Sequence, residues 1–244
     1  MSPRITLATT ERVLRQLRHD HRTVALVLLV PTLLLTLFRY VFDGQPETFD
    51  RVGAPMVGIF PLVSMFLVTS IAMLRERTSG TLERLMSLPL GKLDLLLGYG
   101  LAFALVAVVQ ASLAAAVAFG LLGLDVEGSI LLVVLLAVAN AVLGMALGLF
   151  LSAFASTEFQ AVQFMPAVIL PQLLLCGLLV PRELMAPLLE WVSALLPMTY
   201  AYDGLARATS GEGGAELALD VAVVLGSIVV ALALGAATLR RRTP

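Results

Sequence analysis

The sequence has few of the residues that most enzymes use for chemistry. Its 244 residues include one cysteine and two histidines, and charged residues make up only 14% of the chain. A single cysteine, Cys176, cannot form a disulfide framework or a cysteine metal site. Both histidines, His19 and His21, precede the first long apolar run. Metal or acid–base chemistry within the apolar runs therefore has almost no side chains to use.

Motifs for nucleotide hydrolysis and for common hydrolytic catalysis are missing as well. A P-loop needs a glycine, four residues and then Gly-Lys-Ser/Thr. The only Gly-Lys pair, Gly91-Lys92, is followed by Leu93, and Met86 stands where the first glycine would be. No G-x-S-x-G or H-E-x-x-H pattern occurs. We therefore expect a chain that is not an enzyme and that binds no metal or other cofactor itself.

Apolar residues dominate the composition of the sequence. They make up 59% of the sequence, and the mean hydropathy is +0.96. About 20 helical residues cross the ~30 Å hydrocarbon core of a bilayer. Six runs suit such spans, and their residues are 24–42, 52–74, 95–124, 129–153, 161–180 and 217–239. Because the runs are continuously apolar rather than alternating, they predict helices rather than barrel strands. The expected fold class is an all-α polytopic membrane protein, with residues 1–244 as one domain.

The distribution of basic residues predicts the orientation in the membrane. Five arginines lie in the N-terminal segment, four basic residues lie between spans two and three, and three arginines lie at the C-terminus. Six spans put all these segments on one side, and positive charge favours the cytoplasmic side. The opposite loops are rich in acidic residues. We expect a plasma (inner) membrane protein with both termini in the cytoplasm and no cleaved signal peptide.

The cytoplasmic segment 1–23 contains an amphipathic stretch. In residues 9–22, Val13, Leu14 and Leu17 cluster on one helical face with arginines around them. Such a helix suits the anionic inner leaflet. A positively charged flank that only orients the first span is the alternative, and the two interpretations are compatible.

A compact charged segment, residues 75–94, separates spans two and three. It contains Arg75, Glu76, Arg77, Glu83, Arg84 and Lys92, and the apolar residues Leu82, Leu85, Met86 and Leu88. Helix-forming residues precede Pro89 and Gly91, which end helices. A helix of two or three turns is unstable alone in water, so it must dock on something. The alternative is a tight cytoplasmic turn, which would need fewer residues.

Two motifs make the sequence resemble a known family. Glu76, Gly80-Thr81-Leu82-Glu83, Leu85 and Pro89, placed after a second span, resemble the first cytoplasmic loop of ABC transporter permeases of the type-2 export class. Residues 176–211 resemble the stretch before the last span of that family. The matching marks there are Gly177, Pro181, Trp191, Pro197, Thr199, Tyr200 and Gly211. One departure occurs at the start of span three, where this chain has Leu97-Gly98-Tyr99 instead of a Gly-Lys.

The resemblance implies a role for the charged segment. In that family it is the coupling helix, which seats in a groove of a separate ATPase subunit. Leu82, Leu85 and Met86 would fill the groove, and Glu76, Glu83 and Arg84 would set the register at its rim. The resemblance also implies two ATPase subunits, which carry ATP and Mg, and a second permease chain, either identical or similar. The bilayer is the remaining partner, and no nucleic acid is expected.

The segment between spans five and six, residues 181–216, is long for a plain outer loop. Its apolar helical stretches, Leu184–Leu196 and Tyr200–Ala208, are too short to cross a membrane and are broken at Pro197. They suggest a re-entrant hairpin, which membranes tolerate where protein or water covers the loop. The resemblance implies the same hairpin as an outer gate, with Gly177, Pro181, Trp191, Pro197, Thr199 and Tyr200 as its marks. Two helices lying on the outer surface are the alternative.

Polar residues within the spans are few and mostly uncharged. Asn140, Gln163 and Gln172 could line a path or form interhelical hydrogen bonds, and Gln163 and Gln172 should lie on opposite faces of span five. Gly144 and Gly148 predict close helix packing within the protomer. Ion-driven pumps usually need buried ionisable residues, so a proton-driven mechanism is disfavoured.

The expected function is the permease subunit of an ATP-driven exporter for a hydrophobic or amphipathic small molecule, such as a drug, antibiotic or lipid-like compound. A polysaccharide or glycolipid export permease of the same class is one alternative. The scattered aromatic residues, at 7%, argue mildly against a sugar polymer. A non-transporting membrane assembly factor is the other alternative, and it would not need the coupling helix.

Overall fold

The structure is a computed structural model that describes residues 3–81 and 92–238. These residues form helices and no strands. The long helices are α1 (Pro3–His19), α2 (His21–Val41), α3 (Pro46–Thr78), α5 (Lys92–Gly120), α6 (Ile130–Leu151), α10 (Pro197–Ser210) and α11 (Ala215–Thr238). The shorter ones are η1 (Ser152–Phe154), α7 (Glu158–Phe164), η2 (Met165–Ile169), α8 (Leu170–Leu175), η3 (Arg182–Leu184) and α9 (Pro187–Ser193).

Local capping explains where several helices begin. Asp20 accepts a hydrogen bond from the Thr23 amide at the start of α2, and Thr157 accepts one from the Gln160 amide at the start of α7. Ser129 accepts a hydrogen bond from the Leu132 amide at the start of α6. These side chains satisfy amides that have no partner inside the helix. The polar residues between the apolar runs therefore fix the positions of the turns.

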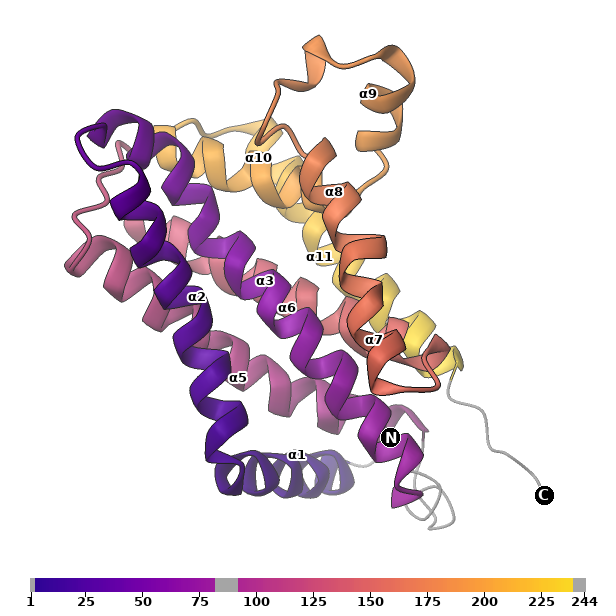
Figure 1. The fold of residues 1–244 in the computed structure, drawn as a ribbon. Helices are drawn as coiled ribbons and strands as arrows, with labels where there is room; N and C mark the ends of the chain where they lie inside the picture. The colour runs from indigo at the N-terminus through magenta and orange to yellow at the C-terminus, as the bar shows by residue number, and fades with distance from the viewer. Residues whose placement is uncertain (1–2, 82–91, 239–244) are drawn as a thin grey trace.

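The long apolar helices lie side by side, and two polar segments cover their ends (Figure 1). Helix α1 runs across one end of the bundle, beside the starts of α2 and α5 and the end of α3. Helix α10 lies at the opposite end, and the η3–α9 segment projects from that end. We call the first the α1 end and the second the α10 end.

Helices α3 and α6 form the centre of the bundle, and glycines allow their close approach. A Cβ atom on Gly144 would lie 2.0 Å from the Leu62 carbonyl oxygen, and one on Gly148 would lie 2.5 Å from the Phe66 carbonyl oxygen. Without a side chain at these positions, the two backbones can touch. The packing predicted for Gly144 and Gly148 within one chain is therefore confirmed.

The described residues contain six helical segments long and apolar enough to cross a membrane, as the sequence predicts. The bounds of each span differ from those of its apolar run by one to six residues, and spans two and five show the clearest differences. Helix α3 begins at Pro46 and continues to Thr78, because polar residues at both ends extend the helix beyond its apolar part. The fifth span is divided into α7, the π-helical η2 and α8. Pro166 and Pro171 lie in this region, and each lacks the amide that a regular helix would use.

The segment between spans five and six also differs from its prediction. The structure has the 3-10 turn η3 and the short helix α9 in place of one helix over Leu184–Leu196. Pro197 is the first residue of α10 rather than only a break, since proline suits the first turn of a helix. Gly211 ends α10 with a φ of 76°, a left-handed conformation that favours glycine.

Candidate functional site

The last turn of α3 connects to several other helices through charged side chains. Arg75 makes a two-pronged contact with Glu158 at the start of α7, at 2.7 Å and 3.1 Å. Arg77 donates a 2.8 Å hydrogen bond to the Ser152 carbonyl oxygen after α6. Glu76 pairs with Arg12 of α1 at 3.5 Å. We call Arg12, Arg75, Glu76, Arg77, Tyr99 and Glu158 the α3-end cluster.

Glu76 lies inside the protein, with 6% of its surface exposed. Its Oε1 atom faces Arg12, and its Oε2 atom has no hydrogen-bond partner among the described residues. Arg12 also donates a hydrogen bond to the Tyr99 hydroxyl, and its guanidinium carbon lies 5.4 Å from the centroid of the Tyr99 ring. This geometry combines an ion pair with a cation–π contact. Arg12 thus joins α1, α3 and α5 at one point.

Helix α1 is held on α5 by small residues. The Thr10 hydroxyl donates a 3.1 Å hydrogen bond to the Gly98 carbonyl oxygen. A Cβ atom on Gly98 would lie 2.5 Å from Cβ of Thr9, so glycine allows the two helices to meet. Val13 is buried beside this contact, and Leu14 and Leu17 are half-buried. Gly98 belongs to the Leu97-Gly98-Tyr99 stretch that departs from the family pattern, and it has a packing role here.

The predicted coupling residues are only partly within the described structure. Gly80 follows the end of α3 with a φ of 72°, and the Thr81 hydroxyl lies 3.0 Å from that of Ser79. Leu82, Glu83, Arg84, Leu85, Met86 and Pro89 lie outside the described residues. Glu76 differs from its expected place at the rim of a partner's groove. It is buried because α1 folds over it and brings Arg12 as its counter-charge.

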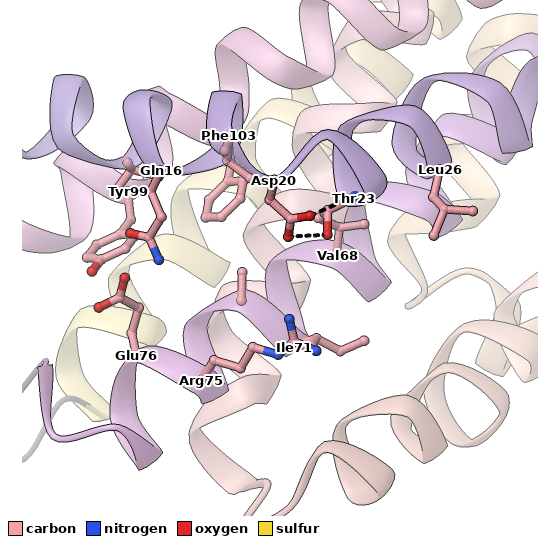
Figure 2. A pocket seen from close by; sticks show the side chains of 13 residues that line it. Gln16, Asp20, Thr23, Leu26, Val68, Ile71, Arg75, Glu76, Tyr99 and Phe103 are labelled. Atoms are coloured by element: carbon pink, nitrogen blue, oxygen red, sulfur yellow. Dashed lines mark hydrogen bonds between the residues drawn. The ribbon is translucent and has the colours of Figure 1, made fainter.

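A cavity of about 310 Å³ opens beside the α3-end cluster (Figure 2). It lies between α1, α2, α3 and α5, and Glu76, Asp20 and Gln16 supply its acidic and polar groups. Asp20 accepts hydrogen bonds from the hydroxyl and the amide of Thr23, which lower the pKa of its carboxyl group. Asp20 is therefore ionised at neutral pH.

Ion pairs also organise the α10 end. Arg182 of η3 donates a 2.8 Å hydrogen bond to Asp203 of α10. Burial raises the pKa of the Asp203 carboxyl, although Arg182 opposes this effect. Arg207 of α10 pairs with Asp220 of α11, which is 3% exposed, and contacts Glu216 at 3.0 Å. These pairs fix α10 between η3 and the last span.

The six residues predicted for an outer gate take different places at the α10 end. Thr199 is buried and donates to the Ser193 carbonyl oxygen at 2.7 Å, while the Tyr200 hydroxyl donates to the Ala194 carbonyl oxygen at 2.8 Å. These two bonds hold the α9–α10 turn, in which Pro197 begins α10. The other three residues lie before this turn. Gly177 has a φ of 99°, and Pro181 directly precedes η3. Trp191 of α9 has 64% of its surface exposed.

The polar residues predicted within the spans lie in different environments. Asn140 of α6 is buried and donates a 3.0 Å hydrogen bond to the Ala201 carbonyl oxygen of α10. Gln172 is buried and donates to Val168 of its own span, whereas Gln163 is exposed. Asn140 therefore links two helices, and of the two glutamines only Gln163 faces outward.

Comparison with known proteins relates the sequence to a family of membrane transporters. Residues 4–208 match the ABC-2 type transporter family. The chain is 30% identical over 170 residues to ABC transporter G family member 23 of Dictyostelium discoideum, which covers 69% of this chain and 24% of that protein. It is 28% identical over 181 residues to the inner membrane transport permease YhhJ of Escherichia coli, which covers 74% of this chain and 48% of that protein.

The fold and these matches define a multi-pass helical membrane protein of the permease class. The chain belongs to the ABC-2 type transporter family. It spans about a quarter to a half of the length of the curated relatives cited here. The partners of the α3-end cluster could not be found from the motif after span two alone. Arg12, Tyr99 and Glu158 are distant in sequence from α3, and no local pattern pairs them with it.

Proposed function

We propose that this chain is the permease subunit of an ATP-driven exporter and is powered by a separate ATPase subunit. The observation that supports the proposal best is the α3-end cluster. The helix that leads into the predicted coupling segment is bonded to α1, to α7 and to the turn after α6. A displacement of that segment would thus reach these three parts of the permease through hydrogen bonds and ion pairs.

The proposed complex has two ATPase subunits and two permease chains, either identical or similar. ATP and Mg would bind to the ATPase subunits, and this chain would bind neither. Both termini and the α1 end would face the cytoplasm, as the basic residues predict. The name of the E. coli relative, an inner membrane transport permease, supports the same membrane for this chain.

The proposed cargo is a hydrophobic or amphipathic small molecule that leaves the cytoplasm or the inner leaflet. The spans offer it apolar side chains and few ionisable ones. The η3–α9–α10 segment would act as a gate at the outer end, because it lies at that end of the bundle and an ion pair joins its α10 helix to the last span. Oxidative crosslinking of cysteines placed along α9 in two copies should then block export, and reduction should restore it.

The coupling role can be tested with two substitutions in the predicted coupling segment. Leu85→Asp removes an apolar group proposed to enter the ATPase groove, and Glu83→Arg reverses a charge at its rim. Each should reduce permease-dependent stimulation of ATP hydrolysis by roughly tenfold or more, the size expected for loss of an interface anchor. ATPase activity would be measured in proteoliposomes that contain the co-expressed complex.

Glu11→Arg provides a matched control, because Glu11 is an exposed acid on α1 that forms an ion pair with the exposed Arg15. It should leave the stimulation unchanged. The amount of inserted permease in each variant would be measured by quantitative blotting. Full stimulation by both coupling variants would contradict the proposed role and would favour a membrane assembly factor.

A further inference from the structure

The cavity at the α1 end has the composition of a small amphiphile site. Its volume of about 310 Å³ lies at the lower end of the range of about 300–1,000 Å³ that is common for ligand pockets. Val13, Leu17, Val68, Ala72 and Phe103 supply apolar walls. Figure 2 shows the acids at opposite sides of this space, with Asp20 at the start of α2 and Glu76 on α3. A ligand must therefore combine an apolar body with a polar group.

The charge of that polar group follows from the partners of the nearby side chains. Glu76 is buried in the cavity wall, and its Oε2 atom accepts no hydrogen bond within the described part of the chain. Such an atom carries a cost unless a donor reaches it. Arg75 also lines the cavity, and its Nε and Nη2 atoms bond the carboxylate of Glu158. Arg12 contacts the other oxygen of Glu76. Asp20 adds a further negative charge, which Arg75 attracts electrostatically but with which it forms no ion pair among the described residues.

A second, purely apolar cavity adjoins the first. It has a volume of about 180 Å³ and shares Leu17, Thr23, Val68 and Phe103 with the first cavity. Its other walls come from apolar residues of α1, α2 and α5, among them Leu14, Val27 and Val109. The acidic cavity and the apolar cavity therefore adjoin at these four shared side chains. Together they suit a head group and a hydrocarbon tail.

Lining residues of the acidic cavity reach the surface on the sides of α2 and α3. Leu26 of α2 is 62% exposed, and Asp20 and Arg75 are exposed as well. Figure 2 shows Leu26 on α2 and Ile71 on α3 among the lining side chains. Because α2 and α3 are candidate membrane spans, a molecule could enter from the bilayer with its tail in the hydrocarbon and its head at the interface.

We propose that this pair of cavities binds a cationic amphiphile, with a protonated amine at Glu76 Oε2, further attraction from the negative charge of Asp20, and an alkyl chain against Leu17, Val68 and Phe103. The inference deepens the proposed function, on which its role as an entry site for cargo rests. Binding itself requires no ATPase and no export. It can therefore fail or succeed independently of the coupling proposal.

The test uses the full chain in phosphatidylcholine nanodiscs and a dodecylamine that carries a diazirine on its alkyl chain. After irradiation, labelled peptides are identified by mass spectrometry. We expect labelling on α1, α2, α3 and α5 at the cavity walls, and we expect it to be competed by dodecylamine at least tenfold better than by dodecanol or dodecanoate. A charge-assisted hydrogen bond corresponds to a difference of about ten- to a hundredfold.

Three variants separate charge from shape. Glu76→Gln keeps the size of the side chain and removes its charge, Asp20→Asn keeps the helix cap and removes the second charge, and Ala72→Phe fills the cavity. Each should lower cavity labelling at least fivefold, whereas Glu11→Gln, on the exposed surface of α1, should not. Equal competition by the three dodecyl compounds, or wild-type labelling of Ala72→Phe, would overturn the proposal. The competition experiment and the labelling of Ala72→Phe can still be carried out if Glu76→Gln fails to fold.

Discussion

At the scale of single residues, Arg12 is the point at which α1 meets the helix that leads to the predicted coupling segment. It faces the buried carboxylate of Glu76 and the ring and hydroxyl of Tyr99. Arg15, one turn further along α1, pairs instead with Glu11 on the exposed surface. Exposed pairs contribute little to stability, whereas a buried charge that loses its partner is costly.

Arg12→Ala should therefore lower the free energy of unfolding by about 1–3 kcal/mol, since it leaves Glu76 buried without a counter-charge. Arg15→Ala should change it by less than about 1 kcal/mol. Thermal unfolding of the purified chain in detergent measures both. The double variant Arg12→Ala/Glu76→Gln should recover part of the loss, because the uncompensated charge is gone. A double variant as unstable as the sum of its two single variants would contradict this pairing.

The sequence predicts the type of these residues better than their contacts. The charged segment after span two and its arginines are visible directly, because they interrupt an apolar chain. The burial of Glu76 could not be predicted, since it depends on α1 folding back over α3 and α5. The role of Glu76 at a partner's groove stays a prediction, and the structure shows its carboxylate buried against Arg12. Asn140 was predicted only as a path or packing residue, and the structure shows it bonded to α10.

At the scale of helices, the contact between α3 and α6 depends on two glycines. Gly144→Ala places a methyl group 2.0 Å from the Leu62 carbonyl oxygen, so the helices must separate. We expect a loss of about 1–3 kcal/mol in the free energy of unfolding, as for other overpacked sites. Gly226→Ala in α11 is the matched control, because its Cβ atom meets nothing within 4 Å.

Thermal unfolding in detergent would distinguish the two glycine variants. The Gly226 variant should be unchanged or slightly stabilised, since alanine favours a helix more than glycine does. A Gly144→Ala protein as stable as the Gly226→Ala protein would show that α3 and α6 do not pack through this glycine.

The six spans are predictable from sequence because the thickness of a bilayer sets the length of each apolar run. The internal structure of span five is less predictable. Its apolar residues are continuous, but Pro166 and Pro171 interrupt the regular hydrogen bonding and a π-helical turn lies between α7 and α8. The length of α9 was also overestimated, because apolar character alone does not show that the helix begins only at Pro187.

At the scale of the whole molecule, the bundle has two different ends. The α1 end carries the α3-end cluster, the described residues that flank the predicted coupling segment, and the proposed amphiphile site. The α10 end carries the ion pairs of Arg182 and Arg207 and the proposed outer gate. ATP-driven export needs the first end to face the ATPase in the cytoplasm. The orientation is therefore the central claim on which coupling, entry and release all depend.

Thiol labelling of intact cells tests this claim most directly. In a Cys176→Ala background, Gln45→Cys, Glu127→Cys and Gly213→Cys should react with a membrane-impermeant maleimide added outside, since all three native residues are exposed in loops away from α1. Ser2→Cys, Ser87→Cys and Thr243→Cys should react only after the cells are permeabilised. Labelling of the Ser87→Cys protein in intact cells would contradict the account, because the predicted coupling segment would then lie on the side without ATP.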